Sequence, residues 1–307
     1  MQIVNDHYSY NSHSCSSLKS FTTIISRIMK RFLISIILLG GTFPIWAQFI
    51  QVEGEFRKLP AQGMAIYKDK CFMLNITGHC RVFDIKKTKL ISDFRLGCYS
   101  STNHANCASF GVEKIGNCKR PVMYVAECSS PYRCFVENVS DSGSVLVQTI
   151  QARNNGKPEV IHDWVVDKKH HFIYGIRTTS EALDSAGTRL TTILKYKLPN
   201  LSEGENVVLT ETNKIDQYDL YFENVLQGAI IKGNKMYLPV GNLKFKGKES
   251  ARNRRALIIV DLRKRKIVKK LDINDITNNE PEDCDFYKGK LLLYCGQTGG
   301  LYDIPYK

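Results

Sequence analysis

Histidine and carboxylate residues gather just ahead of several predicted β-strands, and these residue types carry protons in many enzymes. The predicted catalytic residues are His104, His162, Asp163 and Glu282. Imidazole and carboxyl groups whose surroundings shift their pKa values can divide the roles of general acid and general base. The predicted ligand-binding residues beside them are Gln62, Asn106, Trp164, Gln227, Glu280 and Asp283.

Two other roles are open to the same residues. Histidine with carboxylate suits a transition metal, and carboxylates with amide oxygens suit calcium. The spacing matches no metal-binding motif, so we assign no metal ligand and leave the cofactor unknown. A purely structural role is the other alternative: His104 and Asn106 would then bridge strand backbones, and Glu280 and Glu282 would pair with lysines, because buried polar groups need partners.

Internal repeats indicate which elements position these residues. Residues 82–91 (VFDIKKTKLI) closely match residues 259–268 (IVDLRKRKIV), and residues 301–304 (LYDI) end the chain in the same phase. Each copy alternates apolar and polar residues, passes through a polar turn and, in the two longer copies, alternates again. This pattern is typical of a β-hairpin that recurs as a structural repeat.

A second kind of hairpin precedes each copy. It turns at residues 68–70, 233–234 and 288–289, and two further units with longer loops fit around residues 106–125 and 160–175. The third strand of each unit is then expected at Asp84, Glu137, Lys197, Asp261 and Asp303. These positions lie about 40 to 65 residues apart, close to the length of a four-stranded propeller blade with loop insertions.

The sequence therefore predicts an all-β fold, a β-propeller of about five four-stranded blades, with six as the alternative. The last unit lacks a fourth strand, and residues 49–56, which alternate like a strand, are expected to supply it and close the ring. First strands of blades line the central channel. The residues leading into them should therefore meet at one opening of that channel.

A targeting segment is predicted before the propeller. Met29, Lys30 and Arg31 precede an apolar run at 32–41, and Ala47 offers a small residue for cleavage, as in a secretory signal peptide. The apolar run is too short for a spanning helix. We expect residues 1–28 to lie upstream of the true start or to be disordered, 29–47 to be the signal peptide, and 48–307 to form one exported, periplasmic or cell-surface domain without a transmembrane anchor.

The formal net charge of +13 bears on partners rather than on fold. An exported basic protein is expected to meet a polyanionic glycan or a protein ligand rather than nucleic acid, and to be a monomer. The basic runs at 252–255 and 263–266 have a structural alternative, since Lys and Arg on outer strands discourage edge-to-edge pairing.

Ten cysteines occur, and most lie in apolar strands, where cysteine behaves as a small buried hydrophobe. Cys128 and Cys134 flank a short loop between two predicted strands. An oxidising compartment would allow a disulfide between them. No Cys-x-x-Cys motif occurs, so zinc-ribbon and thioredoxin-type chemistry is not indicated.

The strand pattern around Asp84, the words His104-Ala-Asn106 and Glu280-Pro-Glu282, and the Gln-Gly pairs at 62–63 and 227–228 are similar to those of secreted bacterial propellers grouped with the NHL-type and TolB-like families. The resemblance spans residues 49–307 and implies a fold and an exported location. Our first hypothesis is a binding module that takes a carbohydrate or protein segment at the funnel mouth. The alternatives are a hydrolase or lyase acting on an acidic polysaccharide, and a scaffold of a secreted complex.

Overall fold

The computed structural model describes residues 48–50, 62–181, 183–185, 187–242, 254–296 and 300–306. The predicted signal peptide at 29–47 and the segment 1–28 lie outside these residues. Division of the chain into those segments therefore stays a prediction.

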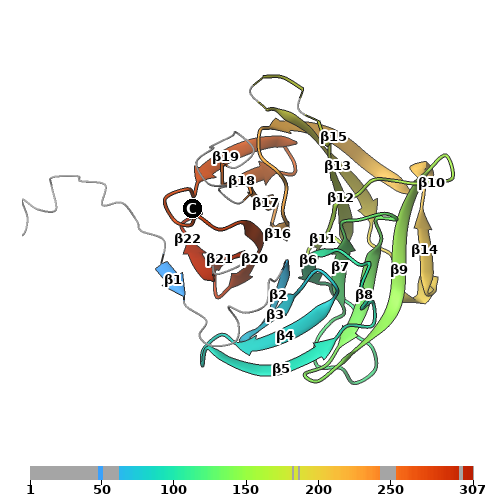
Figure 1. Ribbon diagram of the computed structural model, residues 1–307. Helices are drawn as coiled ribbons and strands as arrows, with labels where there is room; N and C mark the ends of the chain where they lie inside the picture. The colour runs from blue at the N-terminus through green and yellow to red at the C-terminus, as the bar shows by residue number, and fades with distance from the viewer. Residues whose placement is uncertain are drawn as a thin grey trace, which may run out of the picture. The chain divides into compact units, whose positions relative to one another are not determined.

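The described residues fold into five antiparallel sheets arranged as the blades of a β-propeller (Figure 1). Blade 1 holds β2 (Gly63–Tyr67), β3 (Lys70–Leu74), β4 (His79–Asp84) and β5 (Lys89–Arg95). Blade 2 holds β6 (Ala105–Phe110), β7 (Met123–Glu127), β8 (Cys134–Val139) and β9 (Ser144–Asn154). Blade 3 holds β11 (Asp163–Asp167), β12 (Phe172–Thr178), β13 (Arg189–Lys197) and β15 (Lys214–Phe222). Blade 4 holds β16 (Ile230–Lys232), β17 (Lys235–Val240), β18 (Ala256–Asp261) and β19 (Lys266–Asp272).

Blade 5 is assembled from both ends of the described chain. It holds β20 (Pro281–Tyr287), β21 (Lys290–Cys295) and β22 (Leu301–Ile304), and its outer strand is β1 (Gln48–Ile50). Phe49 pairs antiparallel with Tyr302. The predicted closure by an N-terminal strand is confirmed at residues 48–50, the rest of the predicted segment 49–56 lies outside the described residues, and the number of blades is five.

Blade 2 has two strands in addition to the usual four. The short strand β10 (Lys157–Pro158) and the parallel strand β14 (Asn206–Leu209) both pair with the long outer strand β9. Two short 3₁₀ helices, η2 (Leu201–Glu203) and η3 (Glu211–Asn213), flank β14. Extra strands therefore cover the edge that other blades leave to charged side chains.

The sequence repeat is visible in the backbone. The pairing of third and fourth strands slips by one residue between Val82 and Phe83 in blade 1 and between Ile259 and Val260 in blade 4. Asp84 and Asp261 then accept hydrogen bonds from amides of the following turn. Asp84 and Asp261, which occupy equivalent positions in the sequence repeat, thus have the same structural role.

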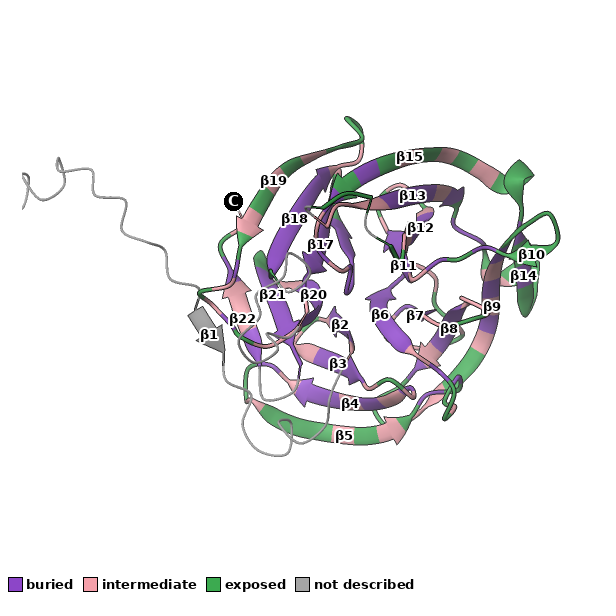
Figure 2. Ribbon diagram, turned by 45° about the horizontal axis from the view of Figure 1, so that its top comes forward, coloured by how far each residue is buried: buried purple, intermediate pink, exposed green. Residues whose placement is uncertain are grey.

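Burial increases toward the ring axis (Figure 2). The inner strands β6 and β11 are buried along their whole length, whereas β5 and β19 alternate between intermediate and exposed residues. Inner strands pack against neighbours on all sides, so their polar residues, such as Asn106 and Asp163, are buried together with the apolar ones. Arg263, Lys264 and Arg265 form the exposed turn between β18 and β19, as expected for an outer edge, but Arg255 is buried at the start of β18.

The suggested disulfide between Cys128 and Cys134 is wrong, because both are free thiols. Cys134 is fully buried in the hydrophobic core on β8, and Cys128 lies in the loop after β7, where it lines a cavity. Burial raises the pKa of the Cys128 thiol to about 12, which keeps it protonated.

Candidate functional site

One carboxylate at the centre of the ring joins three inner strands. Asp283, on β20, is fully buried; its Oδ2 accepts hydrogen bonds from the amides of Met64 on β2 (2.8 Å) and Ala108 on β6 (3.0 Å). Its Oδ1 accepts from the amide of Cys284 at 2.8 Å. Burial raises the pKa of Asp283, and the three amide donors oppose that rise. Asp283 therefore holds blades 5, 1 and 2 together.

A buried amide makes the same kind of link across the other half of the ring. Nδ2 of Asn106, on β6, donates to Oδ1 of Asp163 on β11 at 2.8 Å and to the backbone carbonyl of Gln227 at 2.5 Å. Asp163 is fully buried, and burial raises its pKa to about 7, although the bond from Asn106 lowers it. Its Oδ2 has no hydrogen-bond partner in the described part of the chain.

Two further contacts link other neighbouring blades. Nε2 of Gln227 donates to Oε1 of Glu280 and to the carbonyl of Gly241, both at 2.6 Å, which links blades 4 and 5. Nε2 of His104 lies 3.4 Å from Oε1 of Gln62, which brings blades 1 and 2 together at the same opening. Polar side chains on or just ahead of the first strands thus link blade 5 to blade 1, blade 1 to blade 2, blade 2 to blade 3 and blade 4 to blade 5, and Asn106 reaches from blade 2 to blade 4.

The glycines of the two Gln-Gly pairs, Gly63 and Gly228, lie where inner strands of different blades pack side by side. A Cβ at Gly228 would lie 2.6 Å from Oδ1 of Asp283, whereas a Cβ at Gly63 would lie 3.4 Å from the nearest backbone atoms of β6. The first distance leaves no room for a side chain, whereas the second is that of a van der Waals contact. Of the two glycines, Gly228 is therefore the one at which the neighbouring strand leaves no space for a side chain.

Irregular strand pairing changes the direction in which several of these side chains point. In β6, Ala105 pairs with Glu127 and Ala108 with Val125, so Asn106 and Cys107 share one opposing residue. In β20, Pro281 pairs with Cys295 and Asp283 with Tyr294, which leaves Glu282 without an opposing residue. Such β-bulges redirect side chains and are common beside functional sites.

Glu282 differs sharply from its neighbour Asp283. It is 4% exposed, yet its carboxyl forms no hydrogen bond with a described residue. A Cβ on Gly296 would fall 2.2 Å from its Oε1, so the carboxyl fills the space that this glycine leaves. Burial, together with the charges of Glu280 and Asp283, raises the pKa of Glu282 to about 9. Glu282 is therefore a neutral acid near pH 7.

Both predicted histidines lie partly exposed at the opening. Burial lowers the pKa of His104, and burial and the nearby His104 lower that of His162, so both imidazoles are neutral at pH 7. Nδ1 of His162 accepts a hydrogen bond from the amide of Thr178 at 3.2 Å, and the ring meets Tyr132 edge-on with centroids 5.9 Å apart. That acceptor role places the proton of the neutral ring on Nε2.

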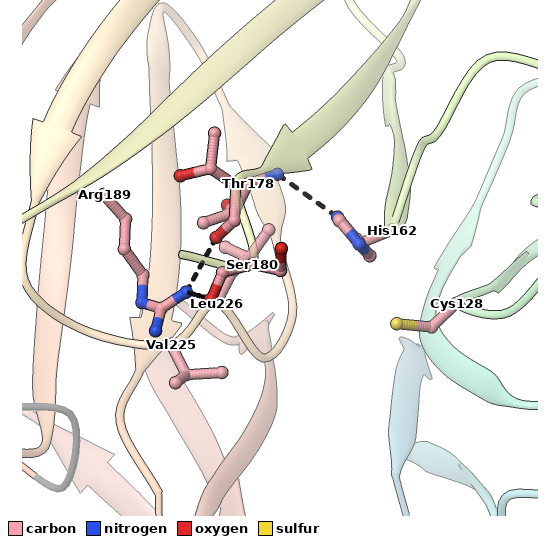
Figure 3. Close-up of a pocket in the computed structure, with 8 residues that line it drawn as sticks. Cys128, His162, Thr178, Ser180, Arg189, Val225 and Leu226 are labelled. Carbon is pink, nitrogen blue, oxygen red and sulfur yellow. Dashed lines mark hydrogen bonds between the residues drawn. The ribbon is translucent and has the colours of Figure 1, made fainter. Parts of the chain in front are cut away.

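His162 borders a cavity of about 220 Å³ (Figure 3). The cavity is lined by Cys128, His162, Thr178, Thr179, Ser180, Arg189, Val225 and Leu226. A second cavity of about 520 Å³ shares His162 and the segment 178–180 and extends to Tyr132 and Arg177. Arg189 donates to the carbonyls of Thr179 and Ser180, and Arg177 forms an ion pair with Glu159. Both guanidinium groups are thus already partnered.

The structure sorts the predicted site residues into three groups. Four of them are partly exposed at the opening, namely Gln62, His104, His162 and Glu280. Four are buried and form hydrogen bonds between blades, namely Asn106, Asp163, Gln227 and Asp283. The last two, Trp164 and Glu282, are packed away from solvent. Trp164 is fully buried in the core, with its Nε1 donating to the carbonyl of Tyr132 at 3.2 Å. The cavity residues at 178–180, Arg189, Val225 and Leu226 were not predicted as site residues, because they carry no motif.

Within the described residues, no helix is both long enough and apolar enough to cross a bilayer. The same residues contain no group of three or more His, Cys, Asp or Glu side chains arranged to hold a metal ion.

Comparison with known proteins adds little to this description. No protein-family model and no curated protein sequence matches the chain. Among solved structures, the chain is similar to Kuenenia stuttgartiensis hydrazine synthase (TM-score 0.40, 11% identity, 75% of this chain and 60% of that chain). It is also similar to Chaetomium thermophilum Raptor (TM-score 0.36, 12% identity, 85% of this chain and 21% of that chain). The chain spans less than two thirds of either protein, and we draw no function from them.

The class of the protein follows from its own strand order: it is a five-bladed β-propeller whose first blade strands are tied together by buried polar side chains.

Proposed function

We propose that this propeller is a binding module and that the opening beside His162 takes an uncharged, hydroxyl-rich ligand such as a neutral carbohydrate. The observation that carries the proposal is the cavity lining. It combines a neutral imidazole, the hydroxyls of Thr178, Thr179 and Ser180, and the apolar side chains of Val225 and Leu226. Small-molecule sites commonly combine apolar walls with a few polar groups that fix orientation.

Charge favours a neutral ligand over an acidic one at this position. Arg189 and Arg177, the cationic residues lining the two cavities, are bonded to backbone carbonyls and to Glu159. A ligand carboxylate would have to compete with partners already in place. Export to the periplasm or cell surface, and the finer likeness to NHL-type or TolB-like propellers, belong to this proposal as predictions.

The catalytic alternative has weaker support. Glycoside hydrolysis uses two carboxyl groups that flank the scissile bond. Asp163 is fully buried and bonded to Asn106, and Glu282 is 4% exposed against Gly296. Substrate would reach neither carboxyl without rearrangement of the inner strands.

Thermal unfolding of the full chain with neutral and acidic oligosaccharides tests the proposal. A ligand that binds the native state at about 100 times its Kd stabilises it by about 2.7 kcal/mol. We expect a neutral oligosaccharide to raise Tm, and His162→Asn to remove that rise. His171→Asn is the matched control, since His171 is exposed at the far end of the β11–β12 hairpin. Absence of any shift with neutral sugars, or equal loss in both variants, would overturn the proposal.

A further inference from the structure

A separate cavity of about 370 Å³ lies between blades 3 and 4. Its lining residues are Asp167, His170, Phe172, Tyr174, Lys195, Asp216, Asn234, Leu262, Arg263 and Arg265. Asp163 opens β11 at the mouth of the channel and Asp167 closes it, so this cavity and the mouth lie at opposite ends of the same strand. The cavity between blades 3 and 4 shares no lining residue with the two cavities beside His162.

The acidic residues of this cavity already have partners. Oδ2 of Asp216 lies 3.1 Å from a guanidinium nitrogen of Arg265, across the boundary between the two blades. Oδ2 of Asp167 lies 2.7 Å from Nδ1 of His170, and its Oδ1 accepts from the amides of Lys169 and His170. Both carboxylates are thus hydrogen-bonded or ion-paired to groups other than Lys195 and Arg263.

Two cations of the lining have no such partner. Lys195 and Arg263 form no ion pair and no side-chain hydrogen bond with any described residue. Nζ of Lys195 lies 3.7 Å from the ring centroid of Phe172 and 5.9 Å from that of Tyr174. Cation–π contact offsets part of the cost of removing the ammonium from water, but it leaves the positive charge facing the cavity.

The turn that carries Arg263 is fixed in place. Oδ1 of Asp261 accepts from the amides of Arg263 (3.0 Å) and Lys264 (2.9 Å). Arg265 has a φ of 53° and is anchored to Asp216 on the neighbouring blade. These contacts hold the backbone of the turn and place Arg263, whose side chain is exposed, beside the cavity that it lines.

We propose that this cavity between blades 3 and 4 binds an oxyanion carried by a small ligand, a carboxylate, sulfate or phosphate group, with Lys195 and Arg263 as its cationic contacts. A guanidinium presents a fork of N–H donors that matches two oxyanion oxygens, and an ammonium adds a point charge. A volume of about 370 Å³ is within the size range of small-ligand pockets. The basic run at 263–266 thereby gains a ligand-binding role at one residue, Arg263.

Titration calorimetry of the full chain tests this site. The probes are a uronic-acid disaccharide, a sulfated disaccharide and inorganic phosphate, with a neutral disaccharide of the same size as control. We expect at least one anionic probe to bind, with an affinity that falls as salt rises because the charges are partly screened. The three anionic probes distinguish which oxyanion the cavity prefers.

Variants locate the binding. Arg263→Gln and Lys195→Gln should each weaken it about tenfold, as expected for loss of one charged contact. Lys264→Gln is the matched control, since Lys264 occupies the same exposed turn without lining the cavity, and it should leave affinity nearly unchanged. His162→Asn should leave anion binding intact, which separates this site from the mouth.

Two results would overturn the site. One is the failure of all three anionic probes to bind. The other is an equal loss of affinity in Lys264→Gln and Arg263→Gln, which would mean that overall charge, and not this cavity, attracts the anion. Arg263→Gln alters an exposed turn residue, so its Tm should match that of the unaltered protein and exclude misfolding as the cause.

Discussion

Two neighbouring residues of β20, Glu282 and Asp283, carry carboxyl groups that differ in their hydrogen bonding. Asp283 points toward β2 and β6 and accepts three backbone amides, whereas Glu282, displaced by a bulge, meets the gap left by Gly296 and accepts no hydrogen bond from a described residue. A sequence pattern treats them as equal members of an acidic cluster. Their difference shows that the position of a side chain relative to the neighbouring strands, and not its residue type alone, decides whether it links the blades.

The largest expected effect comes from removing the central carboxylate. Asp283→Ala leaves the amides of Met64, Ala108 and Cys284 without an acceptor in a fully buried place, and each unsatisfied group costs about 1–3 kcal/mol. We expect the free energy of unfolding to fall by about 3–5 kcal/mol in urea titration. Asp275→Ala, at an exposed aspartate, is the control and should change it by less than about 0.5 kcal/mol.

The second effect tests how tightly the strands approach the axis. Gly228→Ala places a Cβ 2.6 Å from Oδ1 of Asp283, so we expect a loss of about 2 kcal/mol, in the range of overpacked cores. Gly63→Ala, with nearest atoms at 3.4 Å, should cost clearly less. Similar losses at both glycines in denaturant titration would contradict the difference in spacing.

A smaller effect is expected on the opposite half of the ring. Asn106→Ala removes the donor to Asp163 and to the carbonyl of Gln227, for an expected loss of about 1–2 kcal/mol. Since the bond from Asn106 lowers the pKa of Asp163, the variant should shift the Asp163 titration upward from about 7. Carboxyl titration by NMR would check the shift, and an unchanged or lower pKa would count against the contact.

Much of the fold could be predicted from the sequence because propeller blades repeat. The matching segments around Asp84 and Asp261 have the same bulge and the same turn, and the missing outer strand of blade 5 is supplied by β1, as expected. Hydrophobic alternation and turn residues are local signals, so one chain is enough to read them.

The site could be predicted only in part, because its division depends on contacts between distant residues. The residues ahead of the first strands were predicted to meet at one opening, but nothing in the sequence His162-Asp163-Trp164 distinguishes a cavity wall from a buried hydrogen-bond acceptor and a core side chain. Bulges at Asn106 and Glu282 depend on the partner strand. Residues 178–180, at the end of β12 and in the loop that follows it, match no motif, and the fold brings them to the cavity.

One pair of isosteric substitutions at pH 8 tests the central claim most directly. Glu282 has a folded pKa of about 9 against an ordinary value of 4.5, so the unfolded chain releases its proton first and stability falls as pH rises between these values. Glu282→Gln keeps the neutral shape and removes that loss, and should therefore raise the free energy of unfolding. Asp283→Asn turns one acceptor into a donor facing backbone amides and should lower it. Denaturant titration of both variants should give changes of opposite sign, and changes of the same sign would contradict the account.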